Sequence, residues 1–225
     1  GLLLIHDALR RFAGVRDGDA AWATIALLCA SPLLYYMTIA PAFSHATSVF
    51  AVAALVWTTL DARARAAGLG RWALAGALGG VAALVREQDA LFLVVPLGLL
   101  LLDAVRTREL AAAVRRGAVT VLAAIVVFVP QLLAYRALNG AYGPSRLVTR
   151  KMSYSSPHFL EVLFDPGHGL FVWAPVLLLA VAALLVVTVR RRDPVAGALL
   201  LALLLQAWIN GAVESWTQAG AFGSR

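Results

Sequence analysis

The chain has 225 residues, of which 61% are hydrophobic and only 14% are charged. An ordinary soluble domain is about 45–50% apolar and about 25% charged, so this composition excludes the soluble globular class. The net charge of +7 would suit a nucleic-acid-binding protein. The basic residues, however, cluster in short loops between apolar runs, as they do on the cytoplasmic side of membrane proteins, and we expect no nucleic-acid partner.

Apolar runs along the chain predict an all-α fold, a polytopic transmembrane helical bundle with about seven membrane helices. We expect one transmembrane domain over residues 1–225, a fragment truncated at both ends because neither end resembles a natural terminus. A long loop on the outer side of the membrane is predicted over 139–169. The predicted membrane helices are 21–40, 42–60, 72–85, 90–102, 118–138, 170–189 and 194–213.

Four clusters of arginine predict the orientation of the bundle. One cluster precedes the first predicted membrane helix, one follows the second, one precedes the fifth and one follows the sixth. All four lie in the cytoplasm if the chain crosses the membrane twice between neighbouring clusters. This constraint requires residues 72–102 to cross and return. The two runs in that segment are each about 20 Å long, shorter than the roughly 30 Å hydrocarbon core. The polar residues between them would form a turn at or just inside the outer boundary.

That turn consists of Arg86, Glu87, Gln88 and Asp89. The alternative is one long helix through the same residues, which breaks the charge rule. Arg86 at a helix start is well placed to hold an anion, because guanidinium binds phosphate bidentately and helix N-termini favour negative charge. Two other interpretations remain open: Arg86 pairs with a neighbouring carboxylate, or it extends to the membrane interface.

Several other cations also fall on the predicted outer side, where the charge rule disfavours them. Ionisable groups at this depth are costly and usually mark a site. His45 follows Ser44 at the start of the second run, where a substrate contact and an interfacial helix cap are equally consistent with the sequence. The outer cations besides Arg86 are Arg136, Arg146, Arg150, Lys151 and Arg225.

The predicted outer loop contains the spacing H-x2-E-x3-D-x2-H, formed by His158, Glu161, Asp165 and His168. These side chains include ligands that divalent metals accept, but the spacing matches no strict metal motif. Asp165 lies in FDPGHG, where a turn accounts for Asp, Pro and Gly. We therefore assign no metal site and leave the cofactor open.

Three stretches of the chain share motifs with a known group of membrane enzymes. The first is GALGGVAALVREQDALFLVVP, with the pattern G-x3-G-x-A-x-L-x-K/R before a helix that contains proline. The second is LFDPGHGLFVWAPVLLL, and the third is SWTQAGAFGSR. Together they resemble polytopic GT-C glycosyltransferases, in particular bacterial members akin to the protein O-mannosyltransferase and aminoarabinose-transferase group.

The resemblance implies an enzyme that moves a sugar from a polyprenyl-phosphate carrier to an acceptor on the outer face of the membrane. It implies a multi-pass protein of the bacterial plasma membrane, with its site facing the exterior or periplasm. The partners would be the lipid-linked sugar donor and membrane lipid, whereas the sugar and the acceptor stay unassigned. The family's catalytic Asp lies in a first outer loop, before the helices of this chain. The fragment alone is therefore expected to be inactive, and no catalytic base is assigned.

The resemblance also places candidate substrate-binding residues. Arg86 occupies the position of the basic residue that contacts the lipid phosphate, and Arg225 matches the arginine of the last motif. The full set of candidates is Arg86, Glu87, Asp89, His45, His168 and Arg225.

Two other functions compete with this prediction. A transporter or flippase would use the same charges as a substrate path, although such proteins tend to have internal repeats and broken helices near the membrane midplane. A structural membrane subunit would use the outer charges only to bind partners. The sequence has no internal repeat and its unusual charges gather on one side, which favours the enzyme.

Overall fold

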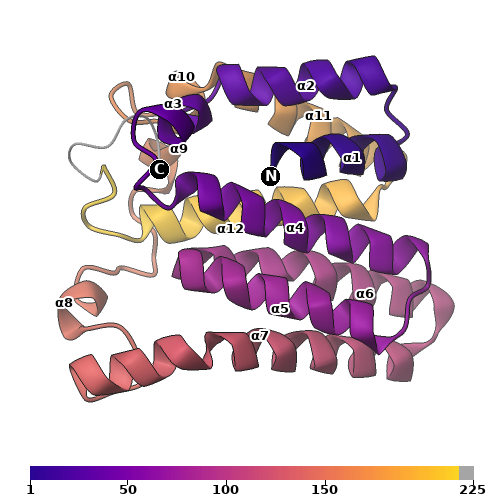
Figure 1. Ribbon diagram of the computed structural model, residues 1–225. Helices are drawn as coiled ribbons and strands as arrows, with labels where there is room; N and C mark the ends of the chain where they lie inside the picture. Colours follow the sequence, from indigo (N-terminus) through magenta and orange to yellow (C-terminus); the bar gives the residue numbers. More distant parts are fainter. Residues whose placement is uncertain (218–225) are drawn as a thin grey trace.

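The structure is a computed structural model that describes residues 1–217, and this part of the chain is all-helical. One isolated antiparallel bridge joins Met152 to Val213. The helices, shown in Figure 1, are α1 (Leu2–Ala13), α2 (Asp17–Cys29), α3 (Leu33–Thr38), α4 (His45–Ala64), α5 (Leu69–Val85), the 3-10 helix η1 (Glu87–Leu93), α6 (Val94–Thr107), α7 (Leu110–Asn139), α8 (Arg146–Thr149), α9 (Phe159–Phe164), α10 (Leu170–Trp173), α11 (Pro175–Arg191) and α12 (Pro194–Gly211).

Three helical segments among the described residues are long and apolar enough to cross a membrane. They are Glu87–Thr107, which joins η1 to α6, then Leu110–Asn139 and Pro194–Gly211. Helix α5 is apolar but has only 17 residues. These helices fit an integral membrane protein, and the all-α prediction is confirmed. The expected number of about seven membrane helices is not confirmed.

Two predicted membrane helices are interrupted by proline. The segment 21–40 divides into α2 and α3, with the break just before Pro32, and 170–189 divides into α10 and α11, with the break at Ala174 before Pro175. Proline disfavours helical geometry in the residue before it and has no N–H to donate. Hydrophobicity alone therefore overestimated the length of these helices.

Other helices are longer than predicted. The polar segment 103–116 is mostly helical: α6 continues to Thr107, and α7 begins at Leu110. The connection is short because Arg108 adopts a left-handed conformation, with φ 61°. Alanine, arginine and glutamate are good helix formers. Helices therefore extend past the apolar residues that define a predicted membrane segment.

The chain reverses direction at Arg86, so the alternative of one uninterrupted helix through residues 72–102 is wrong. Helix α5 ends at Val85, and Arg86 has an extended backbone, with φ −150° and ψ 120°. Figure 1 shows α5 running to one end of the bundle and α6 returning to the other. The connections α1–α2, α4–α5, α6–α7 and α11–α12 all lie at the end of the bundle opposite the end of α5. We call this the basic end, because it carries the four arginine clusters.

Glycines allow α5 and α7 to pack closely. A Cβ at Gly76 would lie 2.0 Å from the Thr120 carbonyl oxygen, and one at Gly80 would lie 2.6 Å from the Ala124 oxygen. The two glycines are four residues apart, so they form one small-residue face on which α7 rests. The Thr120 hydroxyl lies between two carbonyl oxygens and shares its proton between Arg116 of its own helix, at 2.9 Å, and Trp72 across this contact, at 3.2 Å.

Ion pairs join the helices at the basic end. Arg63, near the end of α4, donates two hydrogen bonds to the Asp103 carboxylate of α6, at 2.7 and 2.8 Å. Asp61 is buried and lies within 2.7 Å of Arg71 and 2.6 Å of Arg65. Bidentate and buried pairs have fixed geometry, so these contacts set the order of α4, α5 and α6 at this end.

Much of the apolar surface of α7 is left uncovered. Only Thr120 and Ala124 of this helix are buried, and Leu122 and Val126 are 60% and 67% exposed. A soluble protein rarely exposes a continuous apolar helix face of this length. The exposed face is instead suited to contact with lipid.

Substitution Gly76→Ala is expected to destabilise the bundle, because the new methyl group meets the α7 backbone. Alanine gains about 1 kcal/mol of helix propensity over glycine, whereas overpacking costs about 1–3 kcal/mol. The thermal midpoint in detergent should fall for Gly76→Ala. Gly98→Ala in α6 is the matched control, since no atom lies within 4 Å of its new Cβ. Equal midpoints for the two variants would contradict the packing described for α5 and α7.

Candidate functional site

The polar turn after α5 lies between the start of α4 and the end of α12. Arg86 N–H still donates to the Ala82 carbonyl at 2.9 Å, and Asp89 N–H donates to the Arg86 carbonyl at 2.8 Å. The turn therefore closes on itself and passes directly into η1. Its four side chains contact different neighbours, so each has a different role.

Asp89 is the buried member of the turn, with 4% of its surface exposed. The Ser48 hydroxyl of α4 donates a short hydrogen bond to the Asp89 carboxylate. A buried carboxylate needs such donors, because it has lost its hydration. Asp89, predicted as a substrate-binding residue, thus joins η1 to α4 and is not among the residues that line the neighbouring groove.

Gln88 ties the turn to α12. Its side-chain amide donates to the Asn210 side-chain oxygen at 3.1 Å, and its backbone carbonyl accepts from Gln206 at 2.8 Å. Gln206 and Asn210 are four residues apart and therefore lie on one face of α12. These polar residues of an apolar helix therefore hold both the side chain and the backbone carbonyl of Gln88, in the first turn of η1.

Arg86 and His45 are in direct contact. The Arg86 guanidinium donates to His45 Nδ1, with Nη1 3.1 Å from that nitrogen. The His45 ring also packs on the buried Tyr36, with centroids 4.1 Å apart, and stacks on Phe43 at 6.3 Å. His45 thus holds the guanidinium from the side of α3 and α4. The structure thus brings two of the candidate residues of the sequence analysis into contact.

An open groove of about 510 Å³ lies beside the turn. Arg86, Glu87 and Gln88 form one wall, and the end of α7 and the start of α8 form the other. The lining is mixed, with a guanidinium and a carboxylate facing apolar and polar side chains. The residues contributed by the second wall are Tyr135, Leu138, Asn139, Pro144, Ser145 and Val148.

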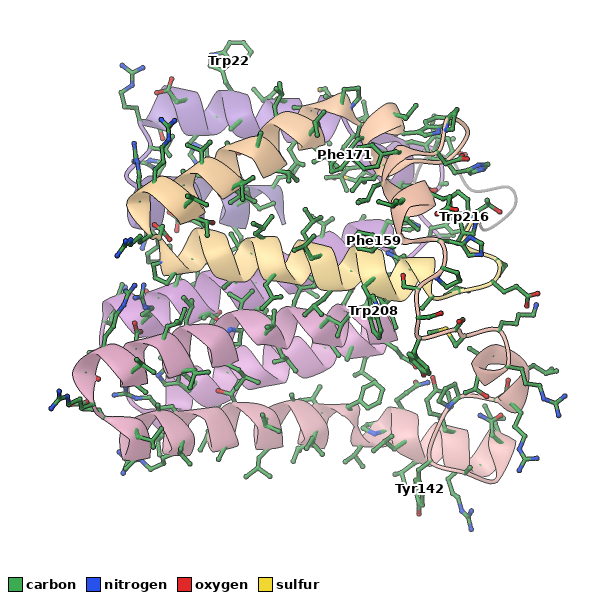
Figure 2. All side chains as sticks on the ribbon, turned by 180° about the vertical axis from the view of Figure 1, so that it is seen from behind. Trp22, Tyr142, Phe159, Phe171, Trp208 and Trp216 are labelled. Carbon is green, nitrogen blue, oxygen red and sulfur yellow. The ribbon has the colours of Figure 1, made fainter. Side chains whose placement is uncertain are left out.

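His168 belongs to a second cluster at the same end of the bundle. Its ring contacts Trp216 edge-on at 6.4 Å, and His158 stacks on the same indole at 5.8 Å. Figure 2 shows Trp216 at the end of the chain's described part, near Phe159. Asp165 accepts hydrogen bonds from the backbone N–H groups of Gly167 and His168, both at 2.8 Å, so it forms the turn that its sequence predicts.

No group of three or more His, Cys, Asp or Glu side chains that would hold a metal occurs within residues 1–217. Of the H-x2-E-x3-D-x2-H spacing, Asp165 holds a turn and His158 lies 4.0 Å from Glu161. The last candidate, Arg225, lies outside the described residues.

Sequence reasoning missed several residues of this region. Ser48 lies one helical turn after His45, on the same side of α4, and this spacing would have paired it with the turn. Gln206 and Asn210 were also detectable, because polar residues inside an apolar helix usually have a partner. Tyr135 and Asn139 carried no such signal, since they look like an ordinary helix end at a membrane interface.

Ser48→Ala is expected to lower the stability of the protein by about 1–3 kcal/mol, because the buried Asp89 carboxylate loses its donor. Thr47→Ala is the matched control, as the neighbouring Thr47 is exposed. Thermal unfolding in detergent measures both variants. If Ser48→Ala unfolds at the same temperature as Thr47→Ala, the hydrogen bond to Asp89 does not support the turn.

No protein-family model, no curated protein and no solved structure significantly matches this chain.

Proposed function

We propose that the chain is part of a membrane glycosyltransferase that takes a sugar from a polyprenyl-phosphate carrier and transfers it to an acceptor on the outer face of the membrane. The observation that carries the proposal is the groove beside Arg86. A guanidinium, held by His45, forms one wall of a space whose other wall includes Leu138 and Val148. A polyprenyl-phosphate has the matching chemistry, with an anionic head next to an apolar chain.

The position of the groove supports the same function. Its lining comes from the turn after α5 and from the end of α7 and the start of α8, and Figure 1 shows these helix ends opposite the basic end. If the basic end faces the cytoplasm, as arginine-rich loops usually do, the groove opens on the exterior or periplasmic side. We infer that the donor reaches the groove from the outer leaflet of a bacterial plasma membrane.

The chemistry of transfer gives Arg86 a specific role. As the bond between sugar and phosphate breaks, negative charge grows on the departing lipid phosphate. A fixed cation next to that phosphate stabilises the transition state more than the ground state. His45 acts as a positioning residue, because it accepts a hydrogen bond from the guanidinium and limits its rotation. Glu87 is exposed beside Arg86 and is available to contact the sugar or the acceptor.

The first test measures binding of a polyprenyl phosphate to the purified chain in detergent, which requires no catalytic base. Arg86→Gln removes a charged hydrogen-bond donor and should weaken binding about tenfold or more. Arg150→Gln is the control, because Arg150 is an exposed cation that does not line the groove. Equal affinity of the two variants for polyprenyl phosphate would remove Arg86 from the site.

The second test measures reaction in a protein that contains this chain at its full length. Sugar transfer from a polyprenyl-phosphate donor should fall about 10–100-fold in kcat/KM for Arg86→Gln, which corresponds to the loss of one charged hydrogen bond. Movement of labelled lipid across a vesicle membrane without any transfer would instead identify a flippase. Absence of both activities would favour the structural subunit.

A further inference from the structure

The segment in which α7 ends and α8 follows carries a concentrated positive charge. Residues 136–151, which we call the α7–α8 corner, contain four cations and no acidic residue. All four side chains are exposed, and none forms an ion pair within residues 1–217. The cations are Arg136, Arg146, Arg150 and Lys151.

The usual charge bias of membrane proteins accounts for cations at one end of the bundle only. The basic end carries the four arginine clusters, and Figure 1 shows α8 at the opposite end, beside the end of α7. Whichever of the two ends faces the cytoplasm, the cations at the other end are present against that bias. An anionic partner at the α7–α8 corner would account for them.

Arg136 shapes the corner from inside α7. Its guanidinium donates to the carbonyl of Gly140, the left-handed residue at which α7 ends, and lies 5.6 Å from the ring centroid of Tyr142. Figure 2 shows Tyr142 on the outer side of this turn, and 65% of its surface is exposed. Arg136 therefore fixes the path by which the chain leaves α7 and presents the residues of α8.

Helix α8 combines cations with exposed apolar side chains. Arg146 and Arg150 are four residues apart, so they lie on one side of this short helix. Between them, Leu147 is 74% exposed and Val148 is 53% exposed. Segments that lie on a membrane surface have this composition, because their apolar side chains enter the headgroup layer while the guanidinium groups reach lipid phosphates.

The position of the corner along α7 agrees with a membrane surface. Helix α7 is long and apolar enough to cross a membrane. Its exposed apolar side chains continue to its end, with Leu133 57% exposed and Leu138 82% exposed. Residues directly after such a helix lie at the boundary between lipid and water.

Two carboxylates from other elements approach the corner without neutralising it. Glu87 lines the Arg86 groove together with Val148, and the Glu214 N–H donates to the Lys151 carbonyl at 2.8 Å. Neither carboxylate forms an ion pair with the corner in the described part of the chain. Four cations against two carboxylates leave a positive surface, which suits an anionic partner.

We propose that the α7–α8 corner rests on the surface of an anionic membrane, with Arg146 and Arg150 directed to the headgroups of acidic phospholipids and Leu147 inserted between them. The attraction is to the charge of a whole bilayer surface, so it is absent in a neutral detergent micelle. Ser145 and Val148 of the same segment form part of the far wall of the Arg86 groove, and the membrane would hold that wall in place. This inference does not depend on the proposed transferase activity.

The test places a fluorescent label on the corner of the full chain. Leu147→Cys is labelled after Cys29→Ala removes the single native cysteine. The chain is reconstituted in vesicles whose phosphatidylcholine carries bromine high on its acyl chains, so that a label in the headgroup layer is quenched. Equal parts of phosphatidylglycerol and phosphatidylcholine should give stronger quenching than phosphatidylcholine diluted with its unbrominated form. High salt should remove the difference. Because phosphatidylglycerol is present in both leaflets, the result does not depend on the orientation of the chain.

Matched variants decide whether the cations of α8 are responsible. Removing both charges with Arg146→Gln and Arg150→Gln should lower the ratio of docked to lifted corner about fivefold for each charge. Arg190→Gln and Arg191→Gln remove the same charge from exposed positions at the basic end and should retain the quenching. Equal losses for the two pairs, or equal quenching in vesicles with and without phosphatidylglycerol, would overturn the proposal.

A label at Leu122, on the uncovered face in the middle of α7, calibrates the measurement. This side chain is 60% exposed and belongs to the part of α7 that faces lipid. Its quenching should be the same with and without phosphatidylglycerol at matched bromine content. A dependence on phosphatidylglycerol of the same size at Leu122 and at Leu147 would show a change of the whole helix and would contradict docking of the corner.

Discussion

Polar groups inside an apolar bundle must find hydrogen-bond partners within the protein, and the break at Arg86 depends on this constraint. Gln206 donates to the Gln88 carbonyl, and Ser48 donates to the Asp89 carboxylate. These contacts come from α12 and α4, which flank the turn. The same partners that make the break stable also fix the direction in which Arg86 and Glu87 leave it. Structure and candidate function thus share one set of hydrogen bonds.

The chain reversal at the turn could be predicted from the sequence because it follows from the distribution of charge. The positions of the arginine loops required residues 72–102 to cross and return, and the structure has that reversal at Arg86. The lengths of the helices were less predictable. Two predicted membrane helices are interrupted near Pro32 and Pro175, whereas other helices extend through polar residues in 103–116 that hydrophobicity does not identify as helical. The close approach of α5 to α7 was not foreseen either, since it depends on which residue faces Gly76 and Gly80 in three dimensions.

For the candidate site, the sequence identified charges but not their partners. His45 and Arg86 meet although 41 residues separate them, whereas His168 belongs to a cluster around Trp216. Asp89 and Glu87 differ sharply in exposure despite lying two positions apart, because successive residues of a tight helix point in different directions. Only a structure can assign one to the interior and the other to the groove. The far wall of the groove comes from the end of α7 and the start of α8, and its residues on α7 resemble an ordinary helix end in the sequence.

The length of α7 has a consequence for how a lipid would meet this protein. Its 30 residues extend about 45 Å, which exceeds a hydrocarbon core of roughly 30 Å. A helix that long either tilts strongly or projects beyond the acyl chains by about three turns. Tyr135 and Asn139 stand in its last two turns, so a projecting α7 raises them to the layer of glycerol and phosphate. A lipid diffusing sideways in its leaflet would then meet the groove at the height of its own headgroup, with no need to be lifted out of the bilayer.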